Sequence, residues 1–230
     1  AQMYQQMIVP QNIEQTRKFY ATDEELIEDI GKAYQDVIKQ FYAAGCRNLQ
    51  LDDCTWGAIV GDVAKQRYQS LGVDIEEVKA RLLKVNNLAL ENRPEDMVIT
   101  SHICRGNYHS TFFTSGPYDS VADYVFAQEH VDALLLEYDD ERSGGFAPLA
   151  KVSPDKKVVL GLITTKKPEL EDKDKVIARI HEAAKYIPLD RLCLSPQCGF
   201  ASCEIGNKLT EEQQWAKLAL VKEIAEEVWK

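Results

Sequence analysis

Hydrophobic residues follow two different spacings along the chain. Short runs dense in Val, Ile, Leu or Met predict buried strands at 7–9, 48–52, 97–102, 133–137, 158–163 and 192–195. Longer segments in which apolar residues recur with the helical period predict helices at 23–43, 74–91, 119–127, 172–186 and 211–229. This alternation is typical of a parallel sheet whose strands are joined by crossover helices.

Several of the predicted helices have recognisable starts. Thr22-Asp-Glu-Glu and Thr210-Glu-Glu-Gln fit the capping box, in which a hydroxyl and the acid or amide three residues later satisfy free backbone N–H groups. Asp74 is a further N-cap, and Gly45 is suited to end the first long helix. These signals support the helix boundaries.

The βα repeat continues without a linker or a low-complexity tract, so a closed barrel and an open doubly wound sheet are the two architectures to compare. No G-x-G-x-x-G follows any predicted strand, which favours the barrel. We therefore predict the α/β class and a (β/α)8 TIM barrel. Six strands are two fewer than a barrel needs, and the chain begins with Ala1. We expect residues 1–230 to be a single, N-terminally incomplete barrel domain that lacks the first two βα units.

Composition narrows the function classes. A formal net charge of −10 and a pI near 5.0, without a basic run, argue against nucleic-acid binding. The apolar run at 158–163 is too short to span a membrane, and no signal-peptide pattern follows Ala1, so we expect a soluble cytoplasmic protein. In that compartment the six cysteines would be thiols, available for metal binding, catalysis or burial.

Reactive side chains fall at the predicted strand ends, where barrel enzymes carry their active sites. Asp52, His102 with Cys104, and Glu137 end three strands, and Cys198 follows the last one. Because His102 and Cys104 are two residues apart, an extended chain projects them from one face, as two ligands of one metal require. Imidazole, carboxylate and two thiolates suit tetrahedral zinc, although the spacing of an isolated His-x-Cys without a CxxC pair, taken alone, favours buried structural residues.

Four motifs in the same order resemble those of the cobalamin-independent methionine synthase family. They are LQLDD at 49–53, HICRGN at 102–107, LLLEYDDERSG at 134–144 and LSPQCGF at 194–200. The similarity runs over essentially the whole chain and is closest to the shorter, single-barrel relatives of the synthases. The barrel fold predicted from the βα pattern agrees with this resemblance.

This resemblance implies a catalytic zinc held by His102, Cys104, Glu137 and Cys198, with Asp52 binding the amino group of homocysteine. The implied enzyme is a zinc-dependent methyltransferase that forms methionine from L-homocysteine and a methylated folate or similar donor. A zinc-bound thiol is held as thiolate at neutral pH, which makes it a nucleophile for the methyl carbon. Its expected partners are therefore small molecules.

The chain departs from the family in the loop after the strand at 158–163, where two-barrel synthases carry a proton-donating His. Here the loop at 164–167 reads Thr-Thr-Lys-Lys, so the catalytic proton donor and the identity of the methyl donor stay open. His109 is near the expected site but fits a solvated loop better. The polar run at 139–142 is expected to be a solvated loop, although after Glu137 it could also orient a ligand or line the substrate pocket. Cys54 is near the mouth of the expected site but receives no role.

Two alternatives are kept. Relatives of the family include epoxyalkane:coenzyme M transferases, whose anionic thiol substrate would require a cation such as Arg105, whereas Asp52 favours the ammonium of an amino acid. The other alternative is a non-catalytic zinc-binding barrel, for which the missing proton-donor His is the only support.

Overall fold

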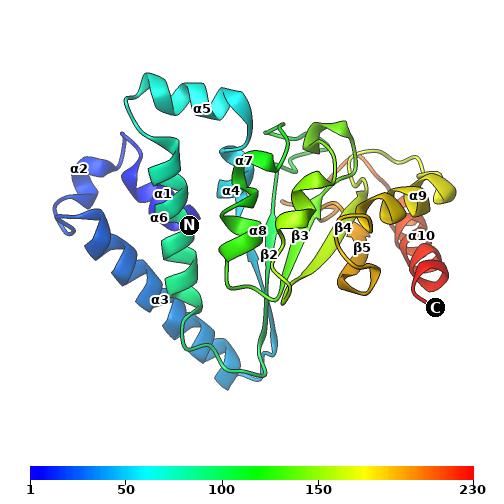
Figure 1. Cartoon of the computed structure of the whole chain (residues 1–230), viewed down its shortest axis with the longest axis horizontal. Coiled ribbons are helices and arrows are strands. Elements are labelled where there is room, and N and C mark those ends of the chain that lie inside the picture. The colour runs from blue at the N-terminus through cyan, green and yellow to red at the C-terminus, as the bar shows by residue number, and fades with distance from the viewer.

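The computed structural model describes residues 1–230, which contain one parallel sheet of five strands (Figure 1). The strands are β1 (Asn48–Asp52), β2 (Val98–Ile103), β3 (Ala133–Glu137), β4 (Lys157–Ile163) and β5 (Leu192–Pro196). Each agrees with its predicted range to within one residue at either end. β3 and β4 are short, mostly buried runs of Ala, Val, Ile and Leu, whereas β1 alternates exposed polar residues with half-buried leucines.

Strands that are neighbours in the sheet are also neighbours in sequence, in the order β1-β2-β3-β4-β5 with every pair parallel. A doubly wound sheet reverses its strand order at a switch point, whereas a barrel adds each strand beside the previous one. The arrangement is therefore that of consecutive βα units of a barrel, and the predicted fold class is confirmed. The sheet has five strands where the sequence predicted six.

The miscounted strand is the segment at 7–9, which belongs to helix α1 (Gln2–Ile8) and the residue after it. Tyr4, Met7 and Ile8 have the i, i+3, i+4 spacing of one helix face, and the intervening glutamines are good helix formers. Tyr4 is fully buried, and its hydroxyl donates to Asp23 at 3.1 Å. The short apolar run was only the end of this helical pattern.

The long helices begin where the capping signals predicted. Thr22 and Thr210 both form complete capping boxes, and Asp74 accepts from the backbone N–H of Glu76. Helices α3 and α6 lie side by side at the N-terminal side of the sheet (Figure 1), where a Cβ on Gly31 would stand 2.6 Å from the Leu88 side chain. The remaining helices are α2 (Ile13–Thr16), α3 (Asp23–Ala43), α4 (Cys54–Ala58), α5 (Gly61–Ser70), α6 (Ile75–Leu90), α7 (Asp119–Ala122), α8 (Val125–Gln128), α9 (Lys173–Ala183), α10 (Glu211–Val228), and the 3₁₀ turns η1 (Glu141–Ser143), η2 (Ala147–Lys151) and η3 (Leu189–Arg191).

The single helix predicted at 119–127 is two short helices, α7 and α8. The helical ladder is interrupted at Tyr124, whose backbone N–H donates to the Val121 carbonyl three residues earlier. The Tyr124 hydroxyl donates to Glu76 of α6 at 3.0 Å, and the ammonium of Lys79 lies over its ring. These contacts with α6 hold Tyr124 at the break, which the apolar pattern alone does not reveal.

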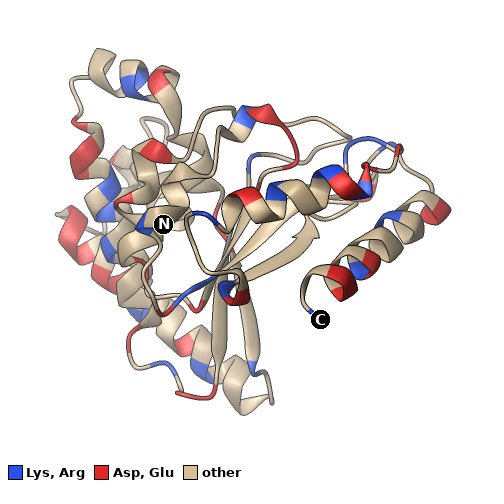
Figure 2. Cartoon of the chain, turned by 45° about the vertical axis from the view of Figure 1, so that its right-hand side comes forward, with Lys and Arg blue, Asp and Glu red and all other residues tan.

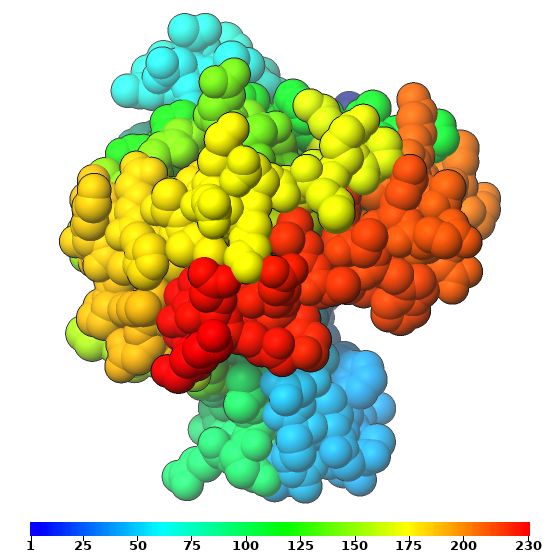
Figure 3. All heavy atoms as spheres, turned by 90° about the vertical axis from the view of Figure 1, so that its right-hand side faces the viewer, coloured from blue at the N-terminus to red at the C-terminus, as the bar shows by residue number.

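Charged residues of both signs are distributed along the helices, whereas the strands are mostly free of them (Figure 2). On the side shown in Figure 3, the C-terminal helix α10 lies beside the start of α9, and Lys173 contacts Glu223 at 2.7 Å and Glu227 at 2.8 Å. None of the helices combines the length and the hydrophobicity that crossing a membrane requires.

Candidate metal centre

The sequence-predicted site residues come from the carboxyl ends of four different strands or from the loops that follow. Asp52 ends β1, His102 lies in β2 with Cys104 just beyond it, Glu137 ends β3, and Cys198 follows β5. Asp52 and His102 are register partners across the β1–β2 pair. Because all strands are parallel, these ends meet at one edge of the sheet, as predicted.

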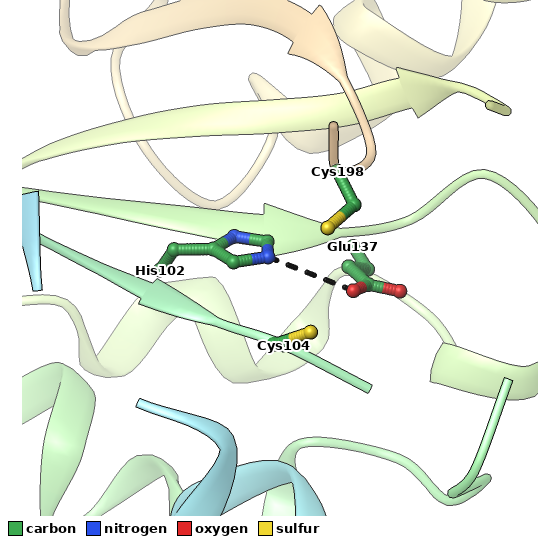
Figure 4. Close-up of side chains that lie close together, drawn as sticks. All are labelled: His102, Cys104, Glu137 and Cys198. Atoms are coloured by element: carbon green, nitrogen blue, oxygen red, sulfur yellow. Dashed lines mark ion pairs between the residues drawn. The ribbon is translucent and has the colours of Figure 1, made fainter. Parts of the chain in front are cut away.

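Four of these side chains converge in space. The ligand atoms of His102, Cys104, Glu137 and Cys198 all lie within 4.8 Å of one another, and the close-up in Figure 4 shows the four side chains pointing toward a common centre. Glu137 is fully buried, His102 is 6% exposed and Cys104 is 7% exposed. The sequence analysis predicted this set, and the structure brings all four members together.

The imidazole of His102 has an unsatisfied nitrogen that faces this centre. His102 Nε2 is buried without a hydrogen-bond partner, and its nearest carboxylate oxygen, Glu137 Oε1, is 3.7 Å away, which is too far for a hydrogen bond. Buried polar atoms are normally satisfied, so an unpaired one requires an explanation. A cation at the centre of the four donors would provide the missing partner, and we conclude that the group can hold a metal ion.

Glu137 is held in place at both carboxylate oxygens. The backbone N–H of Arg105 donates to Oε1 at 2.9 Å, and the Arg142 guanidinium donates to Oε2 at 2.9 Å. The Glu137 backbone is also fixed, since its N–H donates to the Tyr118 hydroxyl at 3.0 Å and its carbonyl accepts from Ser143 at 2.5 Å. Such supporting contacts orient a ligand and are as much part of a metal site as the ligands.

The expectation that 139–142 is a solvated loop was wrong for two of its residues. The side chains of Arg142 and Asp139 are only 5% and 1% exposed, and they form an ion pair of 2.6 Å. Arg142 also pairs with Asp140, whereas Glu141 is exposed. Charged runs usually lie in water, but here Arg142 is drawn inward because the buried Glu137 carboxylate needs a counter-charge.

The four side chains strongly shift one another's proton affinity. Hydrogen bonds from the thiols of Cys198 and Cys54 lower the pKa of Cys104 well below its usual range, and the same contacts raise the pKa of both donors. Burial works against a charged imidazole, but the Cys104 thiolate and the Glu137 carboxylate outweigh it and raise the pKa of His102. Burial raises the pKa of Glu137. Without a cation, these shifts place negative charge on Cys104 and favour the protonated forms of Glu137, Cys198 and Cys54, as expected when several acids share one buried space.

Asp52 and Cys54 border this centre. Asp52 is exposed, Cys54 is half-buried, and Cys54 Sγ lies 3.9 Å from Asp52 Oδ1. Ligand atoms of Asp52, Cys54 and Cys104 are within 4.8 Å of one another, so the two clusters share Cys104. Cys54 is the first residue of α4, whose N-cap Asp53 accepts from the Thr55 backbone N–H. Its position could have been inferred from the adjacent strand-end Asp52.

The loop after β4, where two-barrel synthases carry a proton-donating His, contributes a buried lysine. Lys166 is 9% exposed and donates from Nζ to Asn107 Oδ1 at 3.0 Å. Asn107 in turn donates to the Gly199 carbonyl at 2.6 Å, next to Cys198, and accepts from Asn207 at 2.9 Å. This hydrogen-bond network ties the loops after β2, β4 and β5 together and fixes the segment that carries Cys198. The sequence analysis missed the network.

Two further residues considered from the sequence have structural contacts. The Arg105 guanidinium is 1% exposed, lies 4.1 Å from the centre of the Tyr118 ring and donates to the Gly116 carbonyl at 2.6 Å. His109 is half-buried rather than fully solvated, and its Nδ1 lies 3.2 Å from the Gly206 carbonyl oxygen. Neither side chain is in the group of four potential ligands.

The fold and this site define the class of the protein: a parallel α/β domain of the barrel type, with a candidate His, Glu and two-Cys metal centre at the carboxyl edge of its sheet. The chain belongs to the family of the catalytic domain of cobalamin-independent synthases, whose model matches residues 15–227. The resemblance predicted from the four motifs is thereby confirmed.

Individual relatives agree with this assignment. An uncharacterized protein of Bacillus subtilis (strain 168), YxjH, is 52% identical over 212 residues, covering 92% of this chain and 56% of YxjH. The crystal structure of a candidate vitamin-B12-independent methionine synthase from Listeria monocytogenes is 39% identical with a TM-score of 0.71, over 90% of this chain and 56% of that chain. A B12-independent methionine synthase from Shewanella sp. W3-18-1, solved with selenomethionine, has the same fold at 21% identity and a TM-score of 0.64, over 91% and 56% of the two chains. The chain thus spans about half the length of the curated relatives it matches.

Proposed function

We propose that this domain binds zinc through His102, Cys104, Glu137 and Cys198 and transfers a methyl group from a methylated folate, or a similar donor, to the thiol of L-homocysteine. The observation that carries the proposal is the convergence of these four donors around an unpaired, buried His102 Nε2. Family membership supports a synthase-type reaction. Because this chain covers about half the length of its relatives, a synthase activity is proposed for it and is not taken over from them.

The four residues suit zinc better than a harder cation. Two thiolates, an imidazole and one carboxylate are a donor set typical of Zn²⁺, whereas Mg²⁺ and Ca²⁺ prefer oxygen ligands throughout. Bound zinc would supply one chemical property, namely that it keeps a substrate thiol deprotonated at neutral pH. The buried Glu137 and the lowered pKa of Cys104 favour a divalent cation at this position.

The side chains around the centre would position the amino acid substrate. Asp52 is exposed beside the centre and carries a carboxylate that can pair with the ammonium of homocysteine. Arg142 and the Arg105 backbone N–H fix the Glu137 carboxylate. The network of Asn107 and Lys166 fixes the loop of Cys198. A site held at several points can keep a thiol in line with the methyl carbon, which displacement requires.

The side chain of Arg105 does not support a coenzyme M transferase activity. The Arg105 guanidinium is buried against Tyr118 and donates to the Gly116 carbonyl, so it is not presented to a sulfonate beside the zinc ligands. Asp52, in contrast, would repel a sulfonate and attract an ammonium group. The amino acid substrate is therefore the better match.

Zinc content and thiol binding test the proposal. Protein washed with a chelating resin should retain about one zinc per chain, as expected for a site with four protein ligands. Cys198→Ser should lose most of it, while Cys203→Ser, a change in the same loop outside the ligand set, should retain it. Zinc-loaded protein should then bind homocysteine in calorimetry and form methionine from it with a methylated folate. Absence of zinc from the wild type, or equal zinc in both variants, would contradict the assignment of these ligands.

A further inference from the structure

We propose that Cys54 is a third thiol of this centre, which ligates the metal in the free enzyme and is exchanged for the substrate thiol. The inference rests on the proposed function, because it assumes a metal at the four-residue site. It adds a residue that lies outside that set and outside the motifs used to recognise the family. Three side chains, rather than a single cysteine, carry it.

The geometry places Cys54 beside the metal ligands and beside the residue proposed to bind substrate. Its Sγ lies within 4.8 Å of the ligand atoms of both Cys104 and Asp52, and 3.9 Å from Asp52 Oδ1. Cys104 belongs to both clusters, so a ligand on Cys54 would be adjacent to a metal on Cys104. Cys54 is outside the group of four around the unpaired His102 Nε2, so Cys104 is the residue that links Cys54 to that centre.

Cys54 also occupies the route that the substrate must take. Homocysteine carries its ammonium and its thiol at opposite ends of a short chain. With the ammonium on Asp52 and the thiol at the metal, the carbon chain would have to run past Cys54. The same position can therefore hold either the Cys54 thiol or the substrate. A half-buried residue at the start of the short helix α4 can withdraw when the substrate arrives.

The exchange balances without any further reactant. Binding of Cys54 to the metal releases the thiol proton from Sγ, as for any cysteine ligand. If homocysteine took the place of Cys54, its thiol proton would pass to Cys54 Sγ, so that Cys54 would leave as a neutral thiol and the substrate sulfur would replace it as the thiolate ligand. The number of thiolates on the metal and the net number of bound protons are unchanged. The role is distinct from that of Cys198, which would remain a ligand throughout.

Cobalt substitution counts the thiolates directly, because the near-ultraviolet charge-transfer absorption of Co²⁺ grows with each thiolate ligand. Co²⁺-loaded wild type should show three thiolates, and Cys54→Ser should lose about one third of the band intensity while keeping the metal, since the four main ligands remain. Homocysteine should leave the wild-type intensity unchanged and restore the intensity of Cys54→Ser. Cys46→Ser, a change just before β1 and at the opposite end of that strand from Asp52 and Cys54, should behave as the wild type.

The outcomes separate this inference from the proposed function. Identical spectra of wild type and Cys54→Ser, both rising when homocysteine is added, would overturn the third-thiol role and leave the four-ligand centre intact. A complete lack of charge-transfer absorption in every protein would instead contradict the metal centre itself. A Cys54→Ala variant repeats the comparison without a hydroxyl that could take the place of the sulfur.

Discussion

The guanidinium of Arg142 donates a 2.9 Å hydrogen bond to the carboxylate of Glu137, and both side chains are buried. Arg142 is not among the potential ligands, yet it forms a buried ion pair with one of them. With the Arg105 backbone N–H on the other oxygen, it leaves Glu137 little freedom to rotate. The pair explains how a carboxylate that would be costly to bury alone can lie at the base of the site.

Loss of Arg142 should therefore weaken metal binding without removing a ligand. In Arg142→Leu the buried Glu137 carboxylate loses its ion pair with the guanidinium and is free to turn. We expect zinc affinity to fall by about 10–100-fold, the usual effect of removing a supporting contact. Competition with a chromophoric chelator measures this directly. Arg191→Leu, which changes an arginine at the amino end of β5, is the matched control and should keep wild-type affinity.

Asp52 should discriminate substrates by their amino group. Asp52→Asn should weaken homocysteine binding by about 10-fold or more, as expected for loss of a charged hydrogen bond. Binding of mercaptobutyrate, which has the thiol and carboxylate of homocysteine without the ammonium, should be nearly unchanged by the same substitution. Calorimetry on zinc-loaded protein compares the two ligands. An equal loss for both would show that Asp52 acts on the site as a whole and not on the ammonium.

Gly57 should be intolerant of a side chain because of its closeness to Cys104. A Cβ at position 57 would stand 2.2 Å from the Cys104 carbonyl oxygen, so either α4 or the strand end that carries the ligand must move. We expect Gly57→Ala to lower the free energy of unfolding by about 1–3 kcal/mol and to weaken metal binding. Gly145→Ala is the matched control, since nothing lies within 4 Å of its added Cβ. Chemical denaturation and chelator competition give the two readouts.

Stability should depend on pH through Glu129, a fully buried carboxyl outside the metal centre. Burial raises the pKa of Glu129 to about 8, and only one of its oxygens has a partner, Asn86 Nδ2 at 2.7 Å. An acid whose folded pKa is raised keeps its proton in the folded state while the unfolded state has lost it. Its stabilising contribution is complete below the unfolded pKa near 4.5 and is lost as the pH rises toward 8.

Urea denaturation across this pH range should therefore show wild-type stability decreasing from about 4.5 to 8, as the linkage relation requires. Glu129→Gln keeps the shape and a hydrogen-bond partner for Asn86 but cannot ionise, so its stability should fall less over the same interval. Parallel curves for the two proteins would mean that Glu129 is ionised in the fold.

Much of the fold was predictable because the signals are local. The capping boxes at Thr22 and Thr210 depend on neighbouring residues alone, and each strand is a short run of branched residues bounded by polar ones. The segment at 7–9 was misread because three apolar residues cannot distinguish a strand from the end of a helix. The convergence of His102, Cys104, Glu137 and Cys198 was predictable because the carboxyl ends of parallel strands meet at one edge of a sheet. The family motifs that contain these residues indicated the same site.

The contacts that support the ligands were not predictable in the same way. Arg142 is five residues from Glu137 but looks like part of a solvated charge run, and only the burial of the carboxylate reveals its role. Lys166 and Asn107 are 59 residues apart and meet because β2 and β4 end at one edge. The position of Cys54 beside Asp52 could be inferred from the sequence, but its closeness to Cys104 depends on the direction in which the short helix α4 begins.

The most direct test of the account is X-ray absorption at the zinc edge of zinc-loaded protein with selenohomocysteine, the selenium analogue of the substrate. The account predicts a selenium neighbour in the first coordination shell of zinc, together with sulfur and nitrogen or oxygen neighbours, and loss of this signal in Cys198→Ser. Exchange with Cys54 would not mask it, since selenium is distinct from every protein ligand. Zinc bound at the site with no selenium in its first shell would contradict the central claim that this centre binds and activates the substrate thiol.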